Sequence, residues 1–227
     1  MATMLNGFSK YKHLLLMVLY PFVGLGFVYC EHVVNKTVYL MDFPAIDHVL
    51  PFVPFMIWPY IFWYFFVAFP FFWYALRSGP SFTRFTWYIY GAMVSTYVIY
   101  LFFWNGEDLR PPLAGLQGMD INVIRWVYAH DSPQNVNPSI HVMDTMGVWF
   151  TLSRDQLFQK HRWPVVVVAI LSVTIIASTL LVKQHSILDV TGGLLWSALW
   201  YGLIYSRWSP FFRSGRFTVP NTLIDQR

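Results

Sequence analysis

Long stretches of apolar residues without charge alternate with short charged segments along the whole chain. Five such stretches are long enough to consider as helices in a membrane: 14–30, part of 49–76, 85–106, 163–182 and 190–206. A helix that crosses the hydrocarbon core of a bilayer needs about 20 consecutive, mostly apolar residues. The pattern therefore predicts at least five membrane-spanning helices joined by mostly short connections.

A sixth span is predicted over residues 140–153, a shorter stretch that contains Asp144. The distribution of cations favours it, because six spans place four of the 15 Lys and Arg residues on one side and the rest on the other. The four are Lys36, Arg110, Arg125 and Lys183. Cytoplasmic loops carry the excess of positive charge. We therefore expect an all-α, polytopic membrane protein with six transmembrane helices and both termini in the cytoplasm.

The composition agrees with this interpretation. Of 227 residues, 56% are hydrophobic and only 11% are charged, whereas soluble domains carry roughly 25% charged residues. The net charge of +4 fits basic cytoplasmic loops, and without a run rich in Lys and Arg we expect no nucleic-acid partner. A single cysteine excludes an intramolecular disulfide. Residues 1–227 are expected to form one domain, and the short loops favour a bacterial plasma membrane.

Chemically useful residues gather in the loops that this topology places outside. The long loop 105–138 leads into Pro138-Ser139-Ile140-His141, where Ser139 is placed to cap a helix whose free amides would attract an anion. In the loop at 183–189, His185 and Asp189 are four residues apart and share a helix face. A carboxylate beside an imidazole prepares the other ring nitrogen to act as a nucleophile or base. Active-site loops are therefore expected at about 105–141 and 183–189.

Together these residue types indicate phosphoryl transfer without a cofactor. The set on the predicted outer face comprises His141, His185, Asp189, Arg110, Lys183 and Ser139. Cations stabilise the transferring group, one histidine attacks phosphorus, and the other protonates the leaving oxygen. A zinc site is the metal alternative, with His141, Asp144, His185 and Asp189 as ligands. It is disfavoured because the nearby cations would repel a divalent ion.

The chain resembles the type 2 phosphatidic acid phosphatase superfamily of membrane lipid phosphatases and phosphotransferases. The resemblance rests on Arg110-Pro111, on Pro138-Ser139-Ile140-His141, and on the spacing from Ser178 to His185 and Asp189. It implies that His185 attacks phosphorus to form a phosphohistidine, that His141 is the general acid and that Asp189 orients His185. It also implies that the Arg110 and Ser139 positions hold phosphate, while Asp144 could line the pocket.

Two positions depart from the family pattern. Phe103 stands where the first motif has lysine, and Thr179 stands where the third motif has arginine. We hypothesise that Lys183, two residues before His185, supplies one of the missing phosphate-binding cations. The histidine–histidine–aspartate set is retained, as it is in relatives that transfer a phospho-headgroup between lipids.

The resulting expectation is an enzyme that hydrolyses a lipid phosphate or pyrophosphate at the outer leaflet, with no metal and no cofactor. Two alternatives remain open. The first is a phosphotransferase, similar to sphingomyelin or inositol phosphorylceramide synthases, that moves a phospho-headgroup to an acceptor lipid. The second is a lipid-binding relative that has lost activity.

Overall fold

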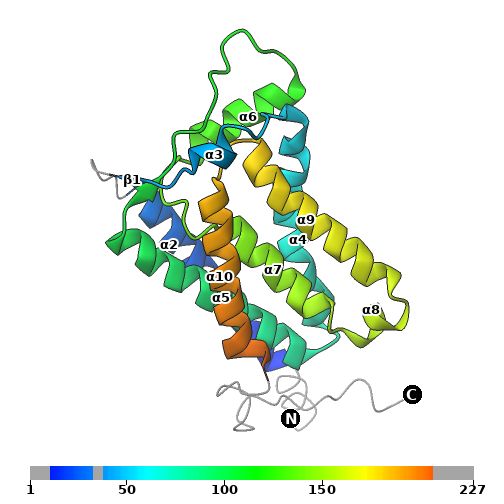
Figure 1. The fold of residues 1–227 in the computed structure, drawn as a ribbon. Coiled ribbons are helices and arrows are strands. Elements are labelled where there is room, and N and C mark those ends of the chain that lie inside the picture. The colour runs from blue at the N-terminus through cyan, green and yellow to red at the C-terminus, as the bar shows by residue number, and fades with distance from the viewer. Residues whose placement is uncertain (1–10, 33–37, 207–227) are drawn as a thin grey trace, which may run out of the picture.

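The chain folds into a bundle of helices, seen in a computed structural model that describes residues 11–32 and 38–206 (Figure 1). Within these residues five helical segments are long and apolar enough to cross a membrane. They are η1 and α2 (Lys12–Leu19 and Tyr20–His32), η2 and α4 (Pro54–Met56 and Ile57–Ala75), α5 (Gly79–Phe102), α9 (Trp163–Leu181) and α10 (Ile187–Tyr205). The prediction of a mainly helical fold with several potential membrane spans is confirmed.

The segment predicted as a sixth span forms helix α7 (Ile140–Leu152). Its 13 residues give a length of about 20 Å, short of the roughly 30 Å of a hydrocarbon core. It is therefore not among the five candidate spans of the described residues. Instead it packs against α4, α5, α9 and α10, and Figure 1 shows it between α10 and the pair α4 and α9. The shortest of the six predicted segments thus lies at the centre of the bundle.

Three loops that the six-span topology places outside, at about 31–48, 105–138 and 183–189, meet in their described parts at one end of the bundle. Short strands β1 (Tyr39–Leu40) and β2 (Asn105–Gly106) pair in parallel and join the first loop to the second. Lys183 Nζ in the third loop donates a 2.7 Å hydrogen bond to the Asp47 carbonyl, at the end of α3 (Pro44–Asp47). The long loop also contains helix α6 (Met119–His130). The opposite end holds the short helix α8 (Gln156–Lys160), as Figure 1 shows.

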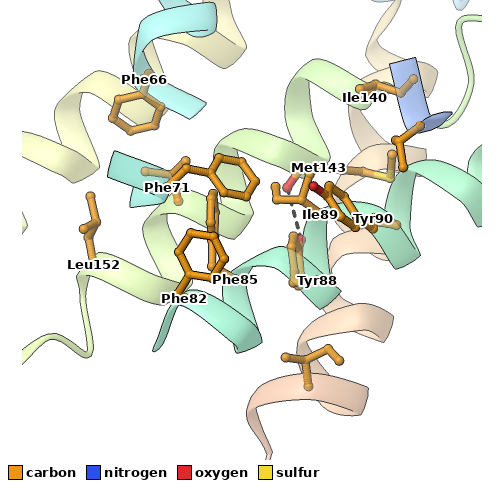
Figure 2. Close-up of a cluster of buried hydrophobic side chains, with 14 of the residues drawn as sticks. Phe66, Phe71, Phe82, Phe85, Tyr88, Ile89, Tyr90, Ile140, Met143 and Leu152 are labelled. Carbon is orange, nitrogen blue, oxygen red and sulfur yellow. Dashed lines mark hydrogen bonds between the residues drawn. The ribbon is translucent and has the colours of Figure 1, made fainter. Parts of the chain in front are cut away.

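Aromatic side chains fill the core between α4, α5 and α7 (Figure 2). Tyr88 on α5 is fully buried and donates a 3.1 Å hydrogen bond to the Met143 carbonyl on α7. Gly147 on α7 lies against the same ring, where a Cβ atom would come within 2.4 Å of it. The Tyr88 ring thus packs directly on the backbone of α7, which fixes α7 against α5 and with it the start of α7 at the loop end of the bundle.

Candidate active site

Two histidines that are 44 residues apart in sequence meet at the loop end of the bundle. His141 lies in the first turn of α7, and His185 lies in the loop just before α10. The Nε2 atom of His185 is 3.4 Å from Nδ1 of His141, and the ring centroids are 5.5 Å apart. Two ring nitrogens at this separation can act on the same bound group.

Asp189 lies behind His185 on the side away from His141. Its Oδ2 atom is 3.4 Å from Nδ1 of His185 and accepts a 2.8 Å hydrogen bond from the Ser186 amide. That amide contact belongs to a capping box at the start of α10, in which the Ser186 hydroxyl accepts from the Asp189 amide. The carboxylate is thus held by the helix start. Nδ1 of His185 makes no hydrogen bond among the described residues, so its contact with Asp189 is electrostatic. The carboxylate favours a proton on this nitrogen, which leaves the lone pair of Nε2 facing His141.

Aromatic rings of α4 hold the other histidine. Tyr60 and Trp63 contact the His141 ring, with centroids 4.6 and 4.3 Å from it. Its Nε2 atom is buried and has no hydrogen-bond partner among the described residues, so the ring presents Nδ1 to His185. Asp144 follows one turn later on α7. It is 1% exposed, and its Oδ1 atom likewise has no partner within the described part of the chain.

Both histidines and Asp144 line a cavity of about 790 Å³. The cavity follows α4 from Ile61 to Ala75, a distance of about 20 Å along the helix axis. It also follows η1 and α2 from Leu14 to Glu31, and most of its lining is apolar or aromatic. Its length and apolar walls suit a hydrocarbon chain whose polar end reaches the histidines.

Of the Asp, Glu, Lys and Arg residues in the described part of the chain, only acidic ones line this cavity. Glu31, Asp131 and Asp144 contribute to its wall, and no Lys or Arg among the residues with described positions does so. Glu31 Oε2 accepts from the Ser132 amide at 3.1 Å, and Asp131 Oδ2 accepts from the Tyr60 hydroxyl at 2.9 Å. The predicted phosphate-binding cations, Arg110 and Lys183, are therefore not among the residues that line the cavity.

Arg110, predicted to bind phosphate, lies next to the cavity with most of its donors in use. Its NH1 group donates to the Tyr128 carbonyl at 3.2 Å, and NH2 donates to the Asp131 carbonyl at 2.7 Å and to the Gln184 side-chain oxygen. The guanidinium also lies over the Tyr128 ring, with Cζ 4.5 Å from the centroid. Arg110 therefore braces the loops around the site, and it is not part of the cavity wall.

Lys183 is also placed away from the cavity. Its Nζ atom donates to the carbonyls of Asp47 and Leu50, each at 2.7 Å, and the residue is 7% exposed. Burial lowers the pKa of Lys183, while the nearby carboxylates of Asp47 and Glu107 act in the opposite direction. Its backbone adopts a left-handed conformation with φ of 56°. This geometry directs Lys183 into the 47–50 segment.

Ser139 takes the capping position that the sequence predicts. Its hydroxyl accepts from the Val142 amide at 3.4 Å, and the residue is fully buried. Its own amide donates to the Asp189 carbonyl at 3.2 Å. Ser139 therefore joins the start of α7 to the start of α10, the two places that carry the catalytic candidates.

Two polar residues of the site carry no role in the sequence analysis. Gln184 lines the cavity beside His185, is 3% exposed and accepts a hydrogen bond from Arg110. Glu107 is 4% exposed and lies 3.8 Å from Nε of Arg110. Burial raises the pKa of Glu107 to about 8, although Arg110 opposes the shift. Their positions inside the two predicted active-site loops are the only sequence signal that could have marked them.

A close approach of α10 to α7 positions the site. A Cβ atom on Gly193 would lie 2.8 Å from Cβ of Val142 and 2.9 Å from the Ser139 carbonyl oxygen. Glycine one turn after Asp189 thus lets α10 lie directly on the start of α7. This contact sets how closely His185 and Asp189 come to His141.

The described residues contain no group of three or more His, Cys, Asp or Glu side chains arranged to hold a metal ion. The four residues of the zinc alternative thus do not form such a group. Comparison of the chain with protein-family models, with curated proteins and with solved structures finds no match. The functional argument therefore depends on the geometry of the site itself.

Proposed function

We propose that this protein is a membrane enzyme that transfers the phosphoryl group of a lipid phosphate or pyrophosphate to water through a phosphohistidine. One observation carries the proposal: the Asp189, His185 and His141 side chains form a continuous row at the polar end of a long apolar cavity. A carboxylate, a nucleophilic imidazole and an acidic imidazole in this order are the groups that the reaction requires.

In the proposed reaction a phosphoryl group enters between the two rings, which move apart to admit it. Nε2 of His185 forms a bond to phosphorus, the bond from phosphorus to the lipid oxygen breaks, and His141 gives its proton to that oxygen. Water then attacks phosphorus while His141 takes a proton from it, and the bond from phosphorus to nitrogen breaks. Asp189 stabilises the positive charge that develops on the His185 ring. The reaction as written needs neither a metal nor a cofactor.

The proposed topology has six membrane crossings, with α7 as the short central one and both termini in the cytoplasm. The distribution of Lys and Arg supports it, as does the position of α7 within a ring of longer helices. In a bacterial plasma membrane, this orientation exposes the end with loops 105–138 and 183–189 to the extracytoplasmic side.

Release of inorganic phosphate from lipid phosphates by the detergent-solubilised protein tests the proposal. We expect turnover in the presence of EDTA, loss of turnover in His185→Ala, and an acid-labile, alkali-stable phosphoenzyme trapped from labelled substrate. Full activity in a folded His185→Ala variant would refute the assignment. Absence of turnover with every lipid phosphate would instead favour a non-catalytic lipid-binding protein.

A second candidate function, transfer of a phospho-headgroup to an acceptor lipid, is favoured by the charge of the cavity. Acidic side chains line the described cavity wall and no Lys or Arg does, which suits a headgroup that carries an ammonium ion better than a doubly charged phosphate. The first half-reaction is the same, and an acceptor hydroxyl replaces water in the second. Labelled donor lipid with and without an acceptor separates the two functions, because transfer produces a new labelled lipid whereas hydrolysis releases a water-soluble product.

A further inference from the structure

The side-chain oxygen of Gln184 accepts a hydrogen bond, whereas its side-chain nitrogen has no hydrogen-bond partner among the described residues. NH2 of Arg110 donates to its oxygen. Because a guanidinium can only donate hydrogen bonds, the amide atom that faces it must be oxygen. The amide nitrogen therefore points away from Arg110, and it has no hydrogen-bond partner among the residues that the structure describes.

The residue that carries this unpaired donor lines the cavity next to the histidine pair. Gln184 directly precedes His185, is 3% exposed, and lines the same cavity as both imidazole rings. Buried polar groups in folded proteins are almost always hydrogen-bonded. A buried donor beside a reacting group, without a partner in the protein, indicates that a ligand supplies the acceptor.

We propose that the Gln184 side-chain nitrogen binds a phosphoryl oxygen of the substrate and that Arg110 is the positioning residue behind it. The inference rests on the proposed phosphoryl chemistry at His185 and deepens it. Arg110 is itself fixed by the carbonyls of Tyr128 and Asp131, so it holds the amide in one orientation. A cation on the oxygen of an amide also polarises its N–H bonds and makes them stronger donors.

In this arrangement the Gln184 amide supplies a hydrogen-bond donor for a phosphoryl oxygen, although no cation lines the described cavity wall. Among the described residues no Lys or Arg lines the cavity, and Lys183 is engaged with the 47–50 segment. The charge of Arg110 reaches the phosphoryl group through the Gln184 amide. Donors fixed before the reaction cost little reorganisation when charge develops on the phosphoryl oxygens.

Two substitutions of Gln184 test the proposal, with a matched control. Gln184→Glu keeps an acceptor for Arg110 but removes the donor, and Gln184→Leu removes both. We expect the KM for the lipid phosphate and the inhibition constant of inorganic phosphate to rise by about 10-fold or more, as for the loss of a hydrogen bond to a charged group. Gln117→Glu makes the same change on an exposed part of the long loop. It should leave both constants at the wild-type values.

The positioning role of Arg110 makes a separate prediction. If Arg110 acts through the amide, Arg110→Ala should weaken phosphate binding, and adding it to Gln184→Leu should weaken binding little further. Full additivity of the two effects would show that Arg110 contacts phosphate independently. Thermal melting of each variant in detergent identifies any that fail to fold.

The outcomes separate this inference from the proposed function. Wild-type constants in folded Gln184→Glu and Gln184→Leu, with turnover still dependent on His185, would overturn the role of Gln184 alone. If turnover does not depend on His185, the role of Gln184 is tested by the binding of inorganic phosphate. Tryptophan fluorescence measures this binding, since Trp63 contacts His141. Loss of this binding in both variants supports the inference. Equal binding in wild type and variants, or none in wild type, overturns it.

Discussion

Asp189 has two tasks that a conservative substitution can separate. Its carboxylate contacts Nδ1 of His185 and also accepts the Ser186 amide at the start of α10. Asp189→Asn keeps an oxygen for the helix cap but removes the charge that stabilises the His185 imidazolium. We expect kcat to fall by about 100-fold or more with little change in KM or in melting temperature. Steady-state kinetics and thermal melting in detergent measure this, and a wild-type kcat would remove Asp189 from the mechanism.

Glu107 makes stability depend on pH. Burial raises its pKa from 4.5 to about 8, so the folded protein favours the protonated form more than the unfolded chain does. The contribution of Glu107 to the free energy of unfolding is therefore greatest below pH 4.5, and it is lost as the pH rises toward 8. We expect Glu107→Gln to reduce the fall in melting temperature between pH 5.5 and 8. Asp108→Asn, on an exposed neighbour whose charge is the weakest of the causes of this shift, should change the pH dependence much less than Glu107→Gln, and equal slopes in all three proteins would contradict the assignment.

At the scale of single elements, runs of apolar residues predicted where the helices lie. They did not predict the polar contacts at the ends of the helices. The stretch predicted at 163–182 is α9 (Trp163–Leu181), and the one at 190–206 overlaps α10 (Ile187–Tyr205). The charge-free criterion misses the start of α5, because that helix begins at Gly79 behind a Ser78 cap and includes Arg84. Runs of apolar residues reveal burial in lipid, whereas a helix end is set by a local hydrogen bond.

The four-residue spacing correctly predicted that His185 and Asp189 lie close together, but not on a shared helix face, because His185 precedes the Ser186 cap of α10 and only Asp189 is on the helix. The engagement of Lys183 with Asp47 and of Arg110 with Gln184 could not be predicted in this way. Each contact joins residues more than 70 positions apart, and no local pattern specifies which carbonyl or amide will meet a cation.

The contact between α10 and α7 offers a test of how elements position the site. Gly193→Ala would place a Cβ atom 2.8 Å from Val142 and 2.9 Å from the Ser139 carbonyl oxygen. We expect α10 to move away from α7, with a loss of about 1–3 kcal/mol in stability and a large loss of turnover. Gly202→Ala is the control on the same helix, since no atom beyond the neighbouring residues and the helix's own backbone lies within 4 Å of its Cβ position. Equal activity of the two variants would contradict a positioning role for this contact.

At the scale of the whole molecule, the orientation in the membrane decides which leaflet supplies the substrate. The proposed topology places Asp108 outside and Gln156, on α8, in the cytoplasm. Both residues are exposed, whereas the single native cysteine, Cys30, is 2% exposed. In a Cys30→Ala background, we expect a membrane-impermeant maleimide added to intact cells to label Asp108→Cys and not Gln156→Cys. Permeabilised cells should give labelling of both, which controls for reactivity. The reverse pattern would place the histidine pair at the cytoplasmic face, and labelling of both sites in intact cells would show that α7 does not separate them across the bilayer.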